Sequence, residues 1–151
     1  MIFNMSSERF LIRSAVYLIL LKGKKILLSR RFKTGWMDGH YSLIAGHIDG
    51  NEPVSTAMIR EAKEEAGIEI KKDHLLPATV IHRYYPDQEY VDFFFVSKKW
   101  TGEPKIMELD KCDDMSWFDL NDLPENILPY IKEAVENYKK GIAFFESGWN
   151  N

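Results

Sequence analysis

The chain has 151 residues, of which 45% are hydrophobic and 28% are charged, and its formal net charge at pH 7 is −3. This length suits one domain that can bury a core, and the composition is typical of a water-soluble globular protein. The slightly acidic balance provides no broad basic surface, which argues against a dedicated nucleic-acid-binding protein.

The first half of the chain predicts three strands and one helix. Two β-rich runs within residues 14–31 surround the tripeptide KGK at 22–24, which is a hairpin signal. A third short strand is expected over residues 41–46. A helix is expected over residues 53–66, since its first residue is a proline, and Gly67 suits the left-handed position just past its end.

The second half of the chain predicts three more strands and a second helix. Two strands lie within residues 78–100, separated by a Pro-Asp turn, and a polar loop follows over 101–114. A last strand is expected over 115–120 and a helix over 123–141, where apolar residues keep helical spacing. The aromatic tail AFFESGW, residues 143–149, is expected to pack either on the chain itself or on a partner.

Cysteine usage and hydrophobicity indicate the compartment. Cys112 is the only cysteine, so no disulfide can form within the chain, and a reducing compartment is expected. The first residues, MIFNMSSERFLIRS, carry charges where a secretory signal peptide has its apolar core. The longest apolar run, residues 15–21, is much shorter than the roughly 20 residues that span a bilayer. We therefore expect a cytoplasmic protein without a membrane segment.

The first predicted helix carries three glutamates one turn apart. Glu61 faces both Glu64 and Glu65, and each such like-charge pair costs about 0.2–0.5 kcal/mol on an exposed helix. The acids share an arc of the helix with apolar residues of the preceding turns, so they point toward the protein body or into a cleft. Carboxylates in this position suit a hard divalent cation such as Mg²⁺, whereas a solvated acidic face is the simpler alternative.

The residues that flank the cluster extend it into a longer motif. GHIDGNEPVSTAMIREAKEEAGI, residues 46–68, resembles the Nudix box, G-x5-E-x7-R-E-U-x-E-E-x-G-U, in which U is aliphatic. The fixed letters are matched by Gly46, Glu52, Arg60, Glu61, Glu64, Glu65 and Gly67. Ala62 is smaller than the usual residue at the first U, which concerns packing and not chemistry. The element order is also similar to that of the family, and this implies one α/β (α+β) domain over residues 1–151, with a mixed β-sheet sandwiched between helices.

The resemblance also implies an activity and a set of metal ligands. Nudix enzymes hydrolyse a nucleoside diphosphate linked to another group X, by attack of water on a pyrophosphate phosphorus with Mg²⁺ or Mn²⁺. By this resemblance Glu64, Glu65 and the backbone carbonyl of Gly46 are metal ligands, and Glu61 is either a third ligand or the general base.

Three residues near these ligands receive supporting roles. Arg60 is expected to pair with Glu52 or Glu64 and to orient it, without touching the substrate. Glu108, in the polar loop, is expected to be a metal ligand or the base, as in MutT-type members, with a solvated loop acid as the alternative. Lys111 is a candidate phosphate contact.

Candidate substrate contacts come from aromatic and basic residues. Stacking on a base is expected of Trp36 or Tyr84, with Phe32 and Tyr85 as further candidates. Phosphate binding is expected of Arg30, with Arg31 and Arg83 as further candidates. Core packing of the aromatics and simple solvation of the arginines are the alternatives.

The short chain without insertions is similar to MutT-like nucleoside triphosphate pyrophosphohydrolases. The expected reaction converts a (deoxy)nucleoside triphosphate into a nucleoside monophosphate and pyrophosphate. A dinucleoside polyphosphate hydrolase, for which a tyrosine such as Tyr84 is typical, a nucleotide-sugar hydrolase and a non-catalytic nucleotide sensor remain alternatives, although a sensor has no need of the complete glutamate triad. An isopentenyl diphosphate isomerase is set aside because Cys112 lies in a late loop. The expected partner is a small nucleotide, with no nucleic acid and no membrane, and the chain is expected to be a monomer or a homodimer.

Overall fold

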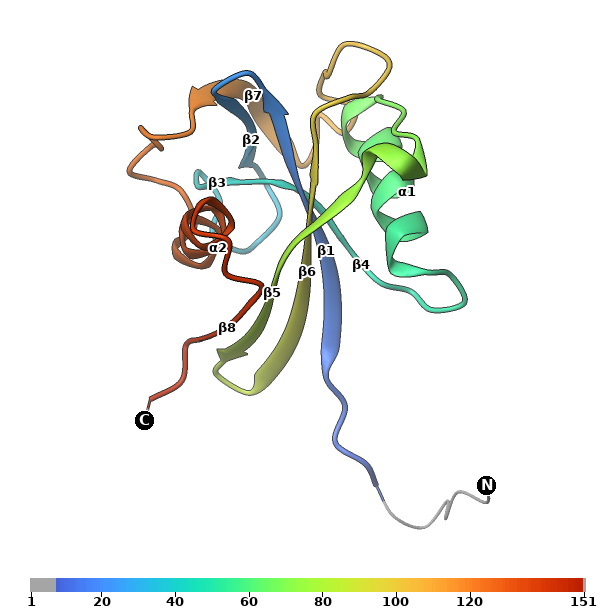
Figure 1. Cartoon of the computed structure of the whole chain (residues 1–151). Helices are drawn as coiled ribbons and strands as arrows, with labels where there is room; N and C mark the ends of the chain where they lie inside the picture. Colours follow the sequence, from blue (N-terminus) through green and yellow to red (C-terminus); the bar gives the residue numbers. More distant parts are fainter. Residues whose placement is uncertain (1–7, 151) are drawn as a thin grey trace.

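Residues 8–150 are described by a computed structural model of the chain, shown in Figure 1. The elements in chain order are β1 (Arg13–Lys22), β2 (Lys25–Arg31), β3 (Tyr41–Ser42), β4 (Ile44–His47), α1 (Val54–Ala66), the 3-10 turn η1 (Lys72–His74), β5 (Leu76–Tyr85), β6 (Gln88–Ser97), β7 (Cys112–Asp119), α2 (Pro129–Lys139) and β8 (Phe144–Ser147). Neither helix in residues 8–150 has the length and apolar character that crossing a bilayer requires.

The strands form a mixed sheet between the two helices. Its order is β3-β2-β1-β6-β5-β8, while β4 also pairs with β1 and β7 also pairs with β2. β1 is parallel to β6 and antiparallel to β4. Figure 1 shows α1 and α2 on opposite sides of the strands. The predicted fold, a mixed sheet sandwiched between helices, is therefore confirmed.

β1 is buried on both faces and divides the core into two clusters. Its even-numbered residues from 16 to 20 pack in a cluster with α1, and its odd-numbered residues from 15 to 21 pack in a cluster with α2. Successive side chains of a strand point to opposite faces, so a strand covered on both sides must be apolar throughout. This explains the uninterrupted apolar run at residues 15–21.

α1 lies where the sequence predicts and is fixed by its small residues. Ala57, Ala62 and Ala66 are fully buried, so the small residue at the first U position allows close packing on the sheet. Gly67 ends the helix with a φ of 69°, and its N–H donates to the carbonyl of Lys63. This packing sets which side of the helix the glutamates occupy.

Several boundaries differ from the sequence prediction for physical reasons. The third predicted strand is divided at Leu43, because the chain leaves β2 and continues beside β1. β7 begins at Cys112, within the predicted polar loop, by pairing with Arg31. α2 begins at Pro129 and not at residue 123, because proline cannot donate a helical hydrogen bond and keeps Leu128 extended.

The aromatic tail packs on the chain itself. β8 pairs in parallel with residues 80–83 of β5. After it, Trp149 donates a hydrogen bond from Nε1 to the carbonyl of His82 at 3.1 Å, and its ring lies 5.0 Å from that of Tyr84. Of the two alternatives for the tail, the structure shows the intramolecular one.

Candidate active site

A cleft of about 810 Å³ brings together most of the residues singled out from the sequence. Its walls come from α1, α2, the first half of β1, the end of β2 with the loop after it, β3, β4, the β5–β6 hairpin, and the start of β7 with the loop before it. The predicted site residues that line it are Arg30, Arg31, Trp36, Gly46, Glu61, Glu64, Glu65, Arg83, Tyr85, Glu108 and Lys111. Arg60 and Tyr84 do not line it.

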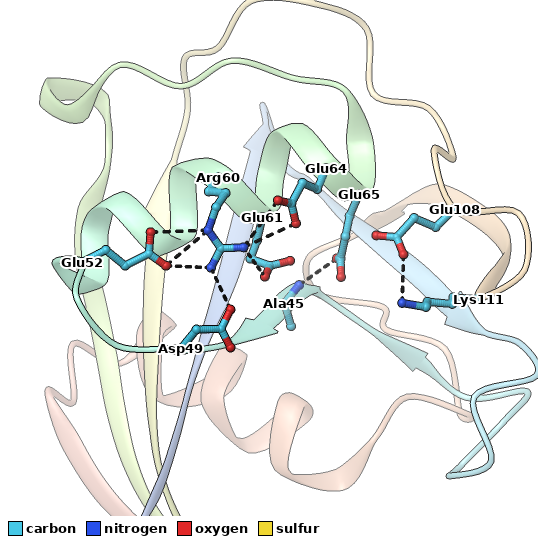
Figure 2. A network of polar contacts seen from close by, with 9 residues as sticks. All are labelled: Ala45, Asp49, Glu52, Arg60, Glu61, Glu64, Glu65, Glu108 and Lys111. Atoms are coloured by element: carbon cyan, nitrogen blue, oxygen red, sulfur yellow. Dashed lines mark hydrogen bonds and ion pairs between the residues drawn. The ribbon is translucent and has the colours of Figure 1, made fainter.

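One wall of the cleft is acidic. Figure 2 shows Glu61, Glu64 and Glu65 projecting from α1, with Glu108 facing them from the loop before β7. The side chain of Glu61 is 13% exposed, whereas that of Glu64 is 52% exposed. Glu65 accepts a hydrogen bond from the backbone N–H of Ala45 at 3.0 Å. The glutamates therefore face the protein and the cleft, and not the outer surface alone.

Arg60 lies behind this wall and holds several carboxylates at once (Figure 2). Its Nη2 is 2.7 Å from Glu52 Oε1, and its Nη1 is 3.0 Å from Glu61 Oε1 and 3.4 Å from Glu64 Oε2. Nη2 also lies 3.8 Å from Asp49 Oδ2. The hydrogen bond from Arg60 lowers the pKa of Glu52. Arg60 thus contacts both expected glutamates, and its role as an orienting residue stays a prediction.

Gly46 is required for space and not for backbone conformation. The other eight glycines all have positive φ values, which favour glycine, but Gly46 does not. A Cβ built at Gly46 would overlap the carboxyl group of Glu61. The glycine on β4 therefore allows the Glu61 side chain to pack directly on the strand.

The buried glutamates lack full compensation of their charge. Burial raises the pKa of Glu61, although Arg60 opposes this effect. Burial also raises the pKa of Glu65, to about 8, and the charges of Glu61 and Glu108 add to the increase. Where water is partly excluded, neighbouring negative charges favour the protonated form of a carboxyl group. A bound cation would favour the ionised form.

The chemistry of these donors fits a divalent cation. Carboxylates and a backbone carbonyl are the oxygen ligands that Mg²⁺ and Mn²⁺ prefer. In residues 8–150, however, no three acidic, histidine or cysteine side chains already converge as a metal-binding group. Arg60 holds Glu61 and Glu64, and Lys111 holds Glu108 at 3.1 Å. Binding of an ion therefore requires these carboxylates to turn away from their present partners.

Another part of the cleft lining, here called the aromatic end, consists of aromatic residues beside a buried ion pair. Arg83 Nε donates to Asp92 Oδ2 at 2.6 Å, and both side chains are at most 8% exposed. The Arg83 guanidinium lies over the rings of Tyr90 and Tyr130, at 4.2 and 4.0 Å. Tyr17 and Tyr130 share a hydrogen bond between their hydroxyls at 2.9 Å. Since Asp92 neutralises Arg83, the phosphate-binding role considered for Arg83 is not supported.

Sequence reasoning missed the tyrosines of this end, which come from β1, β6 and α2. The available signal was a charged residue in each of two apolar strands, Arg83 in VIHRYY and Asp92 in VDFFF. Two opposite charges in adjacent buried strands predict an ion pair inside the protein.

An aromatic pair lies at the mouth of the cleft. The rings of Trp36 and Tyr85 meet edge to face at 6.0 Å, and Trp36 Nε1 donates to the Tyr85 hydroxyl at 3.4 Å. Tyr84 points elsewhere, because neighbouring residues of a strand face opposite sides, and it packs against Trp149. Phe32 also does not line the cleft. Of the two tyrosines, Tyr85 and not Tyr84 lines the cleft, and base stacking by either residue stays a prediction.

The remaining candidates line the cleft with partners of their own. Arg30 Nε donates to Asp113 Oδ1 at 2.7 Å, so its charge is partly engaged. Burial raises the pKa of Cys112, whose thiol donates to the carbonyl of Asp114. A neutral thiol is a weak nucleophile, which agrees with the exclusion of cysteine-based chemistry.

Comparison with known families identifies the family of the chain. The NUDIX domain profile matches residues 11–138. The chain belongs to the Nudix hydrolase family. The acidic wall coincides with the Nudix box, so the cleft is the candidate active site of a Nudix hydrolase.

Individual Nudix relatives are distant. The NAD-capped RNA hydrolase NudC of Pseudomonas entomophila (strain L48) is 27% identical over 139 residues, which are 87% of this chain and 47% of that protein. NudC of Pseudomonas putida KT2440 is 28% identical over 115 residues, 75% of this chain and 38% of that protein. The chain thus spans less than half the length of these curated relatives.

Solved Nudix structures share the fold over most of the chain. A MutT NUDIX hydrolase from Burkholderia pseudomallei is 27% identical with a TM-score of 0.78, covering 84% of this chain and 98% of that one. The MutT protein from Methanosarcina mazei Go1 has a TM-score of 0.75 at 19% identity, covering 89% and 98%.

Proposed function

We propose that this Nudix hydrolase is a Mg²⁺- or Mn²⁺-dependent pyrophosphohydrolase of nucleoside diphosphates linked to X, acting on a (deoxy)nucleoside triphosphate. The observation that carries the proposal is one cleft lined by both the acidic wall and the aromatic end. The acidic wall suits a metal-bound diphosphate. The aromatic end, where Asp92 neutralises Arg83, suits an uncharged heterocycle better than a phosphate.

Each group at the acidic wall has a distinct task in this proposal. Glu64, Glu65 and the carbonyl of Gly46 would hold the ion, and Glu61 would be either a third carboxylate ligand or the base, with Arg60 limiting how far the carboxylates move. When bound, a divalent ion neutralises phosphate charge and makes water more acidic. Either Glu61 or Glu108 then accepts the proton of the attacking water.

The reaction replaces one phosphorus–oxygen bond by another. Water attacks the α-phosphorus of the nucleoside triphosphate. The oxygen that bridged the α- and β-phosphorus leaves with pyrophosphate, and a nucleoside monophosphate remains. Lys111, which lines the cleft beside Glu108, is placed to offset the negative charge that develops on the departing phosphate. Trp36 and Tyr85, at the mouth, are placed to stack on a base or on a second group.

A second candidate is cleavage of a pyrophosphate that links a nucleoside to a second nucleoside or to a sugar. The curated relatives are named NAD-capped RNA hydrolases, although this chain spans only part of them. A dinucleoside polyphosphate or a nucleotide sugar would use the same acidic wall. The cytoplasmic location expected from the sequence belongs to the same proposal.

A substrate panel tests the proposal. The four ribo- and four deoxynucleoside triphosphates, NAD, diadenosine tetraphosphate and a nucleotide sugar are compared at equal concentration with Mg²⁺ or Mn²⁺, and kcat/KM is measured for each. The highest kcat/KM should belong to one of the nucleoside triphosphates. A higher value for NAD or diadenosine tetraphosphate would select the second candidate, and hydrolysis of none would support a nucleotide sensor.

A further inference from the structure

A second hollow, away from the cleft, gathers positive charge. It has a volume of about 460 Å³ and is lined by Lys22, Glu69, Lys71, His74, Lys98, Lys99, Trp100 and Thr101. We call this group of residues the lysine hollow. Four lysines and one histidine surround a single acid, although the chain as a whole has a net charge of −3.

The sheet topology brings these lysines together from three separate segments. β1 and β6 are parallel, and Leu20 is paired with Ser97, so Lys22 ends its strand beside the lysines that follow β6. β5 starts opposite Val96, which places the segment before it, with Lys71 and η1, at the same end. Figure 1 shows β1 and β6 running side by side toward the upper part of the molecule.

The lysines of the hollow have no acidic partner in the part of the chain that the structure describes. Lys22, Lys71, Lys98 and Lys99 are exposed, and in residues 8–150 none of them has a carboxylate within ion-pair distance. Glu69, the acid of the hollow, is 3.3 Å from Lys63, which lies outside it. Clustered like charges repel one another, so a polyanion in the hollow would remove this repulsion.

An aromatic ring supplies a second recognition element. Trp100 lines the hollow and is only partly buried. Its ring stacks on that of Trp117, with centroids 5.9 Å apart and an interplanar angle of 21°, so the indole is held in a fixed orientation. A positively charged groove with an ordered aromatic ring is the usual combination for binding single-stranded nucleic acid, since phosphates contact the lysines and a base stacks on the ring.

We propose that the lysine hollow binds single-stranded RNA. The net charge of −3, from which the sequence predicts no nucleic-acid partner, averages over an acidic cleft and this basic hollow. The hollow and the cleft are joined by one segment, since Thr101 lies in the hollow and Glu108 and Lys111 lie in the cleft. An RNA strand bound in the hollow would therefore lie next to the loop before β7, which contributes Glu108 to the acidic wall of the cleft.

Binding of a labelled RNA tests the proposal independently of hydrolysis. The full chain is titrated in EDTA into a fluorescent, unstructured 20-nucleotide oligoadenylate, and anisotropy is measured between 50 and 200 mM KCl. With three or four phosphate contacts, log K should fall against log salt with a slope of about −2 to −3. The triple variant Lys71→Ala/Lys98→Ala/Lys99→Ala should bind at least tenfold more weakly and flatten the slope by about 2.

A matched variant controls for net charge. Lys132→Ala/Lys139→Ala/Lys140→Ala removes the same number of lysines from α2 and the residue that follows it, and this variant should bind within threefold of the wild type at 100 mM KCl. Equal losses in the two variants, or absence of binding by the wild type, would overturn the proposal. Both variants should keep the wild-type rate on a nucleoside triphosphate, so failure of the proposed hydrolysis would be seen separately.

An abasic strand tests the stacking step without altering Trp100. A 20-nucleotide strand with the same phosphates but no bases should bind about tenfold more weakly than the oligoadenylate, because stacking is lost. Equal binding of the abasic strand or of a double-stranded RNA of the same length would contradict recognition of single-stranded bases.

Discussion

Substitution of Gly46 by alanine should damage the acidic wall through a single methyl group. The added Cβ would overlap the carboxyl group of Glu61, so the Glu61 side chain has to leave its position on β4. The φ of Gly46 lies outside the left-handed region, and alanine therefore introduces no backbone strain of its own. Any effect of the substitution should come from the displaced carboxylate.

The size of the effect follows from this overlap. The overlapped atoms are the far end of a flexible side chain that can turn toward the cleft, so the loss of stability should be small, at most about 1 kcal/mol or a decrease in Tm of roughly 2–4 °C for a protein of this size. Displacement of Glu61 also breaks its contact with Arg60, now 3.0 Å. Misplacement of a catalytic group by about 1 Å can cost about 10²-fold in rate. We expect Gly46→Ala to lose both stability and hydrolysis by these amounts.

A double-mutant cycle distinguishes steric displacement from a general loss of stability. Tm in EDTA and hydrolysis of the best triphosphate are measured for Gly46→Ala, Glu61→Ala and the double variant. Removal of the Glu61 side chain relieves the overlap, so the double variant should recover most of the Tm lost in Gly46→Ala and none of the activity. Additive effects on Tm, or a Gly46→Ala enzyme with normal rate, would refute the reasoning.

Three further changes probe the same cleft. Glu64→Gln should lower kcat by at least about a hundredfold while Tm in EDTA stays equal or rises, since it removes like-charge repulsion; a normal kcat would contradict its role. In EDTA the wild type should lose stability as the pH rises from about 5 to about 8. The pKa of Glu65 is about 8 in the folded state and about 4.3 in the unfolded state, so the folded state binds more protons in this window and loses this advantage as the pH increases. Thermal unfolding at each pH should show that Glu65→Gln removes this loss and that the exposed control Glu69→Gln does not. Tyr85→Ala should raise KM and Tyr84→Ala should leave it within twofold, since only Tyr85 lines the cleft; equal effects would contradict that placement.

The features that the sequence predicts well are the local ones. The glutamates, Arg60 and Gly46 stand within one short motif, so helical spacing alone places the acids together. The hairpin at residues 22–24 and the end of α1 at Gly67 likewise depend on turn residues that are adjacent in the chain. These elements were predictable because the interactions that form them span few residues.

The aromatic end of the cleft was not predictable in this way. Tyr17, Tyr90 and Tyr130 come from β1, β6 and α2, and they meet only because β1 and β6 pair and α2 packs over them. β8 is also non-local, since its pairing with β5 joins residues more than 60 positions apart. Neither the periodicity of apolar residues nor the turn residues of the sequence predict such contacts.

Product analysis with the Glu64→Gln control tests the central claim most directly. The best nucleoside triphosphate is incubated with the wild type and with Glu64→Gln, with Mg²⁺ and with EDTA, and the phosphorus products are identified by ³¹P NMR. The wild type with Mg²⁺ should form nucleoside monophosphate and pyrophosphate, and both Glu64→Gln and EDTA should slow this reaction at least about a hundredfold. Formation of nucleoside diphosphate and inorganic phosphate, or hydrolysis at the wild-type rate in EDTA or in Glu64→Gln, would contradict a metal-dependent pyrophosphohydrolase built on the glutamates of α1.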